Sequence, residues 1–284
     1  MRHSFFVKIV TDCEAASDYF KCRRSAAGIM GFIAYQKISA AMLVLTYGIP
    51  ADYMGEYLHI GQDITTASIR RFAKLVIRLY GDEYLRAPNE EDTKRLMEMN
   101  EKRGWPGILG SLDCMHWKWK NCPKAWQGMY CGKSRDATIV LEVVASEDTW
   151  IWHAFFGLPG TLNDINVLNR SPLFKRLVFG DALTCNYKIM DNEYSMGYYL
   201  TDGIYHDWAT LVKSIKEKNG VPLTRKEAHF TKAQEAAHKD IERAFGVLQA
   251  RFSIVRGPAR FWDKKNLGEH HEMLCDSTQH DHRG

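Results

Sequence analysis

The N-terminal part of the chain, residues 1–103, has the apolar spacing of amphipathic helices. Residues 35–50 are good helix formers and end in a glycine and a proline, both of which terminate helices. Residues 88–104 predict another helix, with Asn89 as its cap, acidic residues in its first turn and a glycine after its end. This part of the chain is therefore expected to be all helical.

The middle of this region has the spacing of a helix-turn-helix segment. A short helix leads through a turn around Gly61 into a second helix, which we expect to begin at Thr65 or Thr66. Apolar residues recur on one face of the second helix and basic residues on another: Ile69, Phe72, Val76 and Leu79 on the first, Arg70, Lys74 and Arg78 on the second. The basic face favours contacts with DNA phosphates. A plain amphipathic helix with a solvated basic side is the alternative that the spacing leaves open.

From Trp105 onward the pattern changes to short strands. Three apolar or β-branched runs predict buried strands, and they are followed by a helix, a fourth strand and a long final helix. The strands are expected over 107–113, 136–146, 149–160 and 197–205, and the helices over 163–177 and 231–255, the last with Ile241, Phe245, Leu248 and Phe252 facing inward. This order predicts a mixed sheet flanked by helices, an α/β or α+β layer fold.

Composition narrows the class of protein only slightly. A net charge of +4 permits an anionic partner without requiring one. The seven cysteines include no C-x-x-C pair, which disfavours a zinc site. No signal peptide is readable, and the longest apolar region, 26–51, is interrupted by Gln36 and Lys37, which argues against a membrane span. We therefore expect a soluble, intracellular protein with free thiols and no membrane partner.

Four carboxylates fall at the ends or edges of the predicted elements. Asp113 ends the first strand, Asp164 begins the helix after the third strand, Asp202 ends the fourth strand, and Glu242 lies beside the apolar stripe of the last helix. The carboxyl ends of strands are where sites tend to form, and like charges brought together there need a cation. Oxygen ligands suit Mg²⁺ or Mn²⁺, and a pair of such ions can clamp the oxygens of an in-line phosphoryl transfer.

Each acid also has a structural explanation. Asp164 could cap a helix, and Asp202 stands in a Thr-Asp-Gly sequence that is common in turns. Glu242 could pair with a basic residue on its own helix, and Asp113 alone carries little information. Spacing alone does not decide between these explanations and a shared metal site.

Four segments with these acids resemble a known family. They are 110–133 (GSLDCMHWKWKNCPKAWQGMYCGK), 155–174 (FFGLPGTLNDINVLNRSPLF), 198–205 (YYLTDGIY) and 239–263 (KDIERAFGVLQARFSIVRGPARFWD). They closely resemble the transposases of PIF/Harbinger DNA transposons, in the plant-type branch, and the nucleases domesticated from them. The resemblance extends from the N-terminal helices to about Glu269 and implies an RNase H-like fold with a DDE set of metal-binding acids.

The resemblance assigns a role to each acid. Asp113, Asp202 and Glu242 match the catalytic DDE set, and Asp164 matches a fourth, supporting metal ligand. The implied activity is cleavage of DNA at element ends and transfer of the freed 3′ hydroxyl to target DNA, with Mg²⁺ or Mn²⁺ as cofactor. The resemblance further implies a location in the nucleus, with the cytoplasm as a second location. It also implies a MYB-like DNA-binding partner protein and a homo-oligomer. Arg243, Arg251 and Arg256, with Arg260, would suit phosphate contacts.

The chain departs from the family after residue 269. The expected domains are a helical region 1–103, an RNase H-like nuclease domain 104–269 and an aberrant tail 270–284, where the family has an apolar helix. A one-base shift of a back-translated tail restores that helix, so we interpret the tail as frameshifted and expect the truncation to impair activity. The alternative function is a domesticated, non-catalytic DNA- or chromatin-associated protein. A hydrolase of small phosphoesters would need a closed pocket that the sequence does not indicate.

Overall fold

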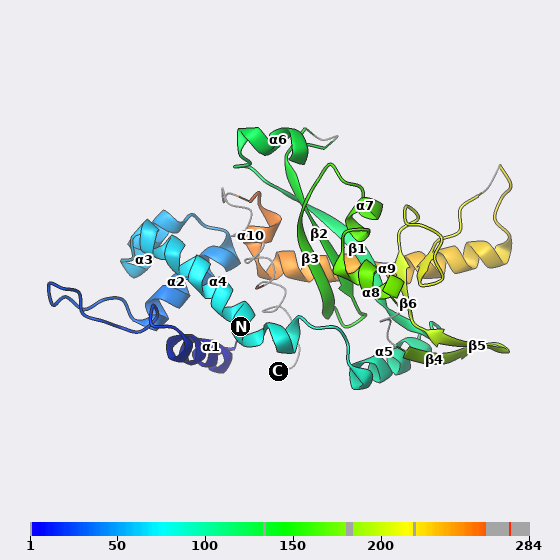
Figure 1. The fold of residues 1–284 in the computed structure, drawn as a ribbon, viewed down its shortest axis with the longest axis horizontal. Coiled ribbons are helices and arrows are strands. Elements are labelled where there is room, and N and C mark those ends of the chain that lie inside the picture. Colours follow the sequence, from blue (N-terminus) through cyan, green and yellow to red (C-terminus); the bar gives the residue numbers. More distant parts are fainter. Residues whose placement is uncertain (1, 133–134, 180–183, 218–219, 260–272, 274–284) are drawn as a thin grey trace. The chain divides into compact units, whose positions relative to one another are not determined.

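Figure 1 shows a computed structural model of the chain. It describes residues 2–132, 135–179, 184–217, 220–259 and Met273, so the predicted tail 270–284 and Arg260 lie outside the described residues, apart from Met273. Two compact units are present: one contains residues 1–85, 118–121 and 248–284, and the other contains 86–117 and 122–247.

The first unit is helical. Its elements are α1 (His3–Ala16), α2 (Ala34–Tyr47), the short 3-10 helix η1 (Ala51–Tyr53), α3 (Met54–Leu58), α4 (Gln62–Tyr84) and α10 (Ser253–Arg256). Helix α2 packs against α4 and α10. As predicted, α2 ends at Gly48, which adopts the left-handed conformation with φ 65°.

Helices α3 and α4 are joined by a short turn. The turn passes through His59 at φ 55°, and Gly61 caps α4. The predicted start of α4 at Thr65 or Thr66 is wrong, because the helix begins at Gln62 and Thr65 is buried inside it. Leu79 was expected on the inward face but is 37% exposed, and the stripe continues to Tyr80 instead.

The second unit is built on a five-stranded sheet. Its strands are β1 (Ile108–Lys118), β2 (Thr138–Ala145), β3 (Ile151–Pro159), β6 (Tyr198–Thr201) and β7 (Leu211–Lys213), in the order β3-β2-β1-β6-β7. Strands β2 and β3 are antiparallel, whereas β1 with β6 and β6 with β7 are parallel. Every residue of β2 is buried, as its β-branched run predicted. The result is the predicted mixed α/β sheet flanked by helices, with the strand order of an RNase H-like fold.

The helices of this unit are α5 (Glu90–Lys102), α6 (Lys124–Tyr130), α7 (Asp164–Leu168), α8 (Pro172–Phe179) and α9 (Arg225–Arg251). Asn89 caps α5 as predicted, with its side chain accepting the Asp92 N–H at 2.8 Å. The single helix predicted over 163–177 is wrong, because the chain forms α7 and α8 with a break at Ser171. A residue that precedes a proline disfavours the helical conformation, so the helix is interrupted at Ser171. Pro172 is then the first residue of α8, a position that suits proline.

A β-hairpin that the sequence analysis did not predict follows α8. It consists of β4 (Thr184–Ile189) and β5 (Asn192–Met196), which pair with each other in a separate two-stranded sheet. Its Tyr187 ring occupies the space that a side chain at Gly107 would need, and Gly107 itself adopts φ +86°. Only glycine tolerates both conditions, so the approach of the hairpin to the start of β1 depends on this position.

One buried side chain of α9 bonds to two parallel strands of the sheet. The Gln234 amide donates Nε2 hydrogen bonds to the carbonyl oxygens of Thr201 in β6, at 3.1 Å, and Val212 in β7, at 3.2 Å. Ala237 of α9 packs in the same core cluster as Ile108 and Leu200. Among the described residues, no helix has both the length and the apolar composition to cross a membrane.

Candidate metal centre

Strand register brings the first two predicted acids together. Ser111 of β1 pairs with Leu200 of β6 in a parallel ladder. Asp113 and Asp202 each lie two residues further on, so they are neighbours at the point where β6 stops. The prediction that Asp113 ends its strand is wrong, since β1 continues to Lys118. What ends near Asp113 is the pairing with β6, and this leaves its side chain beside an open strand end.

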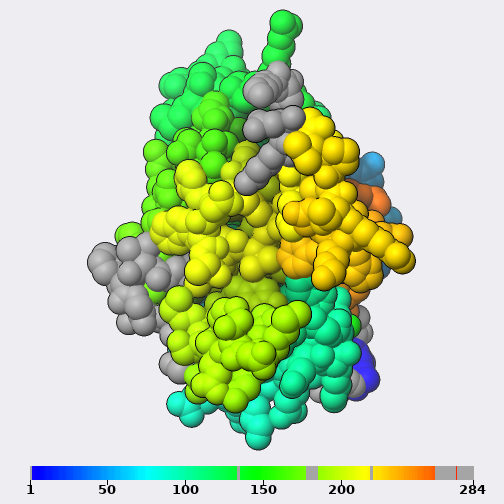
Figure 2. Space-filling model, turned by 90° about the vertical axis from the view of Figure 1, so that its right-hand side faces the viewer, coloured from blue at the N-terminus to red at the C-terminus, as the bar shows by residue number. Residues whose placement is uncertain are grey.

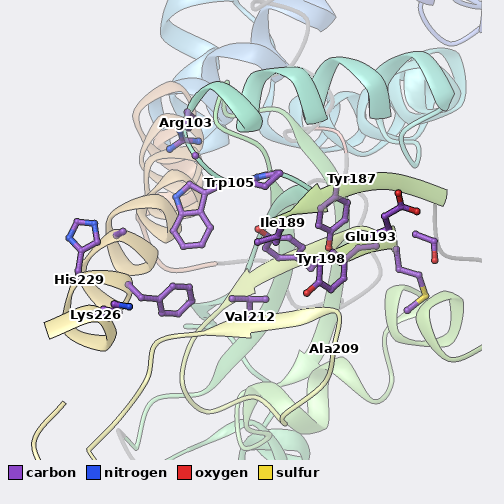
Figure 3. A pocket seen from close by; sticks show the side chains of 17 residues that line it. Arg103, Trp105, Tyr187, Ile189, Glu193, Tyr198, Ala209, Val212, Lys226 and His229 are labelled. Atoms are coloured by element: carbon purple, nitrogen blue, oxygen red, sulfur yellow. The ribbon is translucent and has the colours of Figure 1, made fainter. Parts of the chain in front are cut away.

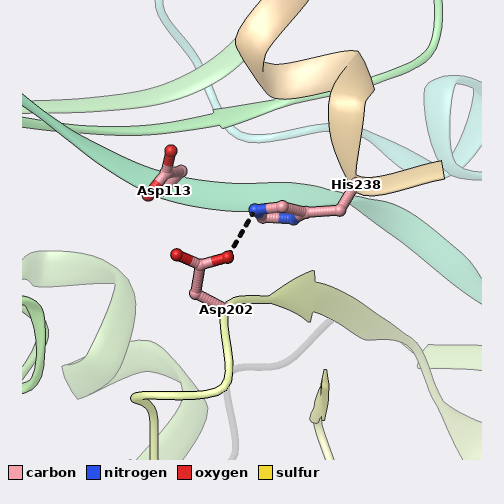
Figure 4. A group of neighbouring side chains, drawn as sticks. All are labelled: Asp113, Asp202 and His238. Carbon is pink, nitrogen blue, oxygen red and sulfur yellow. Dashed lines mark ion pairs between the residues drawn. The ribbon is translucent and has the colours of Figure 1, made fainter. Parts of the chain in front are cut away.

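A histidine from α9 completes this group. The His238 Nε2 atom lies 3.4 Å from the Asp202 Oδ1 atom. One ligand atom from each of Asp113, Asp202 and His238 falls within 4.8 Å of the others. Figure 4 shows the imidazole directed from the helix toward the two carboxylates. His238 is buried, Asp113 is half-buried and Asp202 is exposed, so the group opens to solvent on one side.

The other two predicted acids lie further out. Glu242 is exposed one helical turn after His238, and Asp164 is half-buried at the start of α7. Neither belongs to the compact group, but both act electrostatically on Asp113. Asp164 is not the cap of α7, because the side chain of Asn163 accepts the capping hydrogen bond. The structural explanation that the sequence offered for Asp164 therefore does not hold.

The carboxyl group of Asp113 has a strongly altered acidity. Burial raises the pKa of Asp113 to about 7, which the hydrogen bond from the Cys114 N–H opposes. Three further carboxylates raise it as well: Asp202, Asp164 and Glu242. Burial also raises the pKa of Asp164. This part of the protein therefore holds excess negative charge that a cation would neutralise.

His238 has the properties of a metal ligand. Burial lowers the pKa of His238, and the nearby Asp202 opposes that shift only in part. The neutral imidazole that results is the form that binds metals. Its Nδ1 atom is buried, and no hydrogen-bond partner for it is found among the described residues. Two carboxylates and one neutral imidazole suit a divalent first-row metal such as Mn²⁺, and the carboxylates also suit Mg²⁺, so the residues present fit the implied ion.

Buried polar groups lie behind this centre. The fully buried Glu142 of β2 bonds through Oε1 to His153 Nε2 at 3.1 Å, and the same nitrogen lies 3.1 Å from Ser171 Oγ. The Cys114 thiol and the Tyr205 hydroxyl are 3.6 Å apart. Burial and the charges of Asp164 and Glu142 raise the pKa of both groups, which therefore stay protonated. These contacts hold the strands behind Asp113 in place.

Some of the basic residues predicted to contact DNA form hydrogen bonds or ion pairs within the protein. Arg243 donates to the Glu147 carbonyl oxygen and pairs with Asp240 at 3.2 Å. In the first unit, Arg78 donates to the carbonyl oxygen of Ala16 at 3.2 Å. The remaining predicted bases lie in the first unit: Arg70 and Lys74 on the exposed side of α4, Arg251 at the end of α9 and Arg256 on α10.

His238 was not singled out, although it precedes Glu242 by four residues and therefore shares a helix face with it. The tryptophans of the motif also differ in their environments. Trp117 and Trp119 are buried, whereas Trp126 is 41% exposed. The Trp126 ring stacks on Tyr130, with ring centres 6.4 Å apart.

Comparison with known proteins identifies the family of the chain. Two curated relatives, "Putative nuclease HARBI1" from Homo sapiens and from Bos taurus, are each 22% identical to the chain over 231 residues. The alignments cover 78% of this chain and 59% of each relative, so the chain spans less than two thirds of their length. No solved structure matches significantly. The sequence profile described as plant transposon protein matches residues 82–275, a range that contains all four acids and His238. The chain belongs to this family of plant transposon proteins.

Proposed function

We propose that the protein is a metal-dependent DNA endonuclease or transposase of the Harbinger type, acting by in-line phosphoryl transfer. One observation carries the proposal: ligand atoms of Asp113, Asp202 and His238 lie within 4.8 Å of one another. They do so in a chain of a transposon family whose curated relatives carry the name "Putative nuclease HARBI1". Without a cation, burial and the neighbouring carboxylates make the ionised form of Asp113 unfavourable, as its raised pKa shows. A cluster that carries this cost supports a functional role.

In this proposal Asp113, Asp202 and His238 hold the ion, and Glu242 and Asp164 support them. A divalent cation, when bound, stabilises negative charge on the phosphate oxygens as a Lewis acid. The Cys114 N–H, 2.7 Å from Asp113 Oδ1, orients that carboxylate. The exposed carboxylate of Glu242 can accept a hydrogen bond from the attacking hydroxyl group at the open side of the centre.

The finer parts of the function rest on the family resemblance. DNA as substrate, transfer of the 3′ end to a target, a MYB-like partner, a homo-oligomer and a nuclear location are proposals for this chain. Exposed basic side chains on α4 and α10 support an anionic polymer as the substrate.

Nicking of supercoiled plasmid DNA in Mn²⁺ or Mg²⁺ tests the function. We expect the full chain to nick DNA only with a divalent cation, and Asp113→Ala to lose at least about 100-fold in rate because a charge-stabilising ligand is removed. Asp63→Ala, which changes an exposed acid on α4, is the matched control and should behave like the unaltered chain. Equal nicking by the unaltered chain and Asp113→Ala would refute the assigned site. DNA binding without any nicking would favour the non-catalytic alternative.

A further inference from the structure

A pocket lies in the same unit as the metal centre but is lined by other residues. It is a pocket of about 900 Å³, within the size range of ligand sites, and we call it the aromatic pocket. Five aromatic side chains line it: Trp105, Tyr187, Tyr194, Tyr198 and Phe230. Figure 2 shows the face on which the hairpin β4–β5, α5 and the first turns of α9 come together, and Figure 3 shows the pocket between them.

The aromatic rings offer flat faces rather than a closed core. Tyr187 and Tyr194 are stacked, with ring centres 5.2 Å apart and an angle of 12° between their planes. Trp105 and Phe230 are tilted, with centres 5.7 Å apart. Tyr194 remains 43% exposed although it lines the pocket. A planar group entering the pocket can therefore extend an existing stack.

The charges around the aromatic pocket favour an anionic ligand. The charge of Arg103 is balanced by an ion pair with Asp240 at 2.7 Å, and the charge of Glu193 by an ion pair with Lys188 at 2.6 Å. Lys226 and His229 are exposed on α9, and no ion pair of either is found within the described ranges. The remaining charge is thus positive and stands beside stacking faces. Single-stranded nucleic acid is recognised by this combination.

The distance to the metal centre suits the same strand of DNA. On α9, His229 at the pocket and His238 at the centre are nine residues apart, which is about 13 Å along a helix. On β6, Tyr198 and Asp202 are four residues apart, which is also about 13 Å along a strand. At the duplex rise of about 3.4 Å per stacked nucleotide this separation corresponds to about four nucleotides, and an unpaired strand, which extends further per nucleotide, spans it with fewer.

We propose that the aromatic pocket binds an unpaired base of the DNA strand whose phosphodiester reaches the metal centre, with Lys226 and His229 contacting its phosphates. The inference rests on the proposed function for the identity of the strand. It adds a requirement that the metal centre alone does not impose: DNA near the cleavage point must be single-stranded or locally opened to be held.

Binding of a fluorescent oligonucleotide tests the pocket without cleavage. The probe is a single strand with 2-aminopurine in place of one adenine, mixed with the full chain in Ca²⁺ and compared with the same sequence as a blunt duplex. We expect Tyr194→Ala to weaken binding of the single strand about tenfold, as loss of one stacked base does, and to relieve the quenching of 2-aminopurine. Duplex binding should change less than about twofold. Tyr57→Ala, which removes an exposed tyrosine of α3, should change neither.

A second pair of variants tests the charges on α9. Lys226→Ala should weaken the single strand and reduce the salt dependence of its binding, whereas Lys232→Ala, an exposed lysine of the same helix outside the pocket, should not. Equal losses for single strand and duplex, or no loss from Tyr194→Ala, would overturn the proposal and leave a protein partner as the ligand of this surface. Mn²⁺ binding lost in Asp113→Ala but quenching unaffected by Tyr194→Ala would reject the pocket alone. The reverse pattern would reject the metal centre alone.

Discussion

His238 changes which ion the carboxylates should prefer. Carboxylates alone select hard ions, whereas an imidazole adds affinity for softer first-row metals. The His238 Nε2 atom lies 3.4 Å from Asp202 Oδ1, and burial keeps the ring neutral by lowering its pKa. We therefore expect a preference for Mn²⁺ over Mg²⁺ that a purely acidic site would lack.

The variant His238→Ala should lower Mn²⁺ affinity more than about tenfold and Mg²⁺ affinity much less, because only Mn²⁺ gains strongly from the imidazole. Isothermal titration with each chloride salt measures both affinities. His229→Ala, the same change two and a half turns earlier on α9, should leave them unchanged. Equal losses for both ions would assign His238 a role in packing rather than in ion selection.

Asp113 should destabilise the metal-free protein at high pH. Its folded pKa of about 7 lies above the usual 3.8, so folding favours the protonated form. Stability from that form is complete below about pH 4 and is lost as the pH rises through 7. In EDTA at pH 8, Asp113→Asn should therefore be more stable by up to about 4 kcal/mol, while it abolishes metal binding.

Urea unfolding at pH 4.5 and pH 8 measures this difference. The gain from Asp113→Asn should fall to about 1 kcal/mol at the lower pH, where the acid is neutral in the folded protein but still largely ionised in the unfolded chain. Asp63→Asn, which alters an exposed acid, should show no such dependence. A gain that is the same at both pH values would contradict burial of the charge as its cause.

The residues of the candidate site differ in how far the sequence could predict their positions. Asp113 and Asp202 follow apolar strands, and parallel pairing makes such ends neighbours, so their proximity was predictable. His238 stands in an apolar helical stripe where a histidine is usually a core residue. Its direction depends on how α9 is rotated on the sheet, which Gln234 and Ala237 fix through contacts far apart in sequence.

At the scale of elements, α9 is the part that joins the site. It carries His238 and Glu242, and Gln234 fastens it to both parallel strands beside Asp202. Strongly periodic elements of this kind were predictable, as were the buried runs of β2 and β3. The hairpin β4–β5 was not, because β5 is exposed along its whole length and shows no alternation. The break between α7 and α8 was missed because a proline was read as part of one helix.

Loss of the Gln234 amide should loosen this junction. Gln234→Ala leaves the carbonyl oxygens of Thr201 and Val212 without this donor, and we expect a loss of about 2 kcal/mol of unfolding free energy in urea. Mn²⁺ affinity should fall as well, since His238 lies one turn further along α9. Glu235→Ala, the exposed neighbour, is the control. A stable variant with intact Mn²⁺ affinity would show that α9 is held by its apolar face alone.

At the scale of the whole molecule, compact units do not follow the order of the chain. Residues 118–121 and 248–259 belong with the N-terminal helices, although 104–247 otherwise form the sheet unit with α5. Within the first unit, an isolated β-bridge pairs Trp119 with Ala259. The sequence predicted the fold class and most elements because these depend on local periodicity. It does not reveal such long-range pairings, because they depend on shape complementarity between segments more than a hundred residues apart.

Gly107 makes the aromatic pocket separable from the metal centre. Any side chain there would meet the Tyr187 ring and push the hairpin outward, while Asp113 lies six residues away on a strand held by its own ladder. A substitution at this glycine should thus disrupt the proposed strand-binding pocket and leave ion binding at the metal centre intact. Ion binding and the proposed capture of an unpaired base can therefore be lost separately, each by substitutions that leave the other in place.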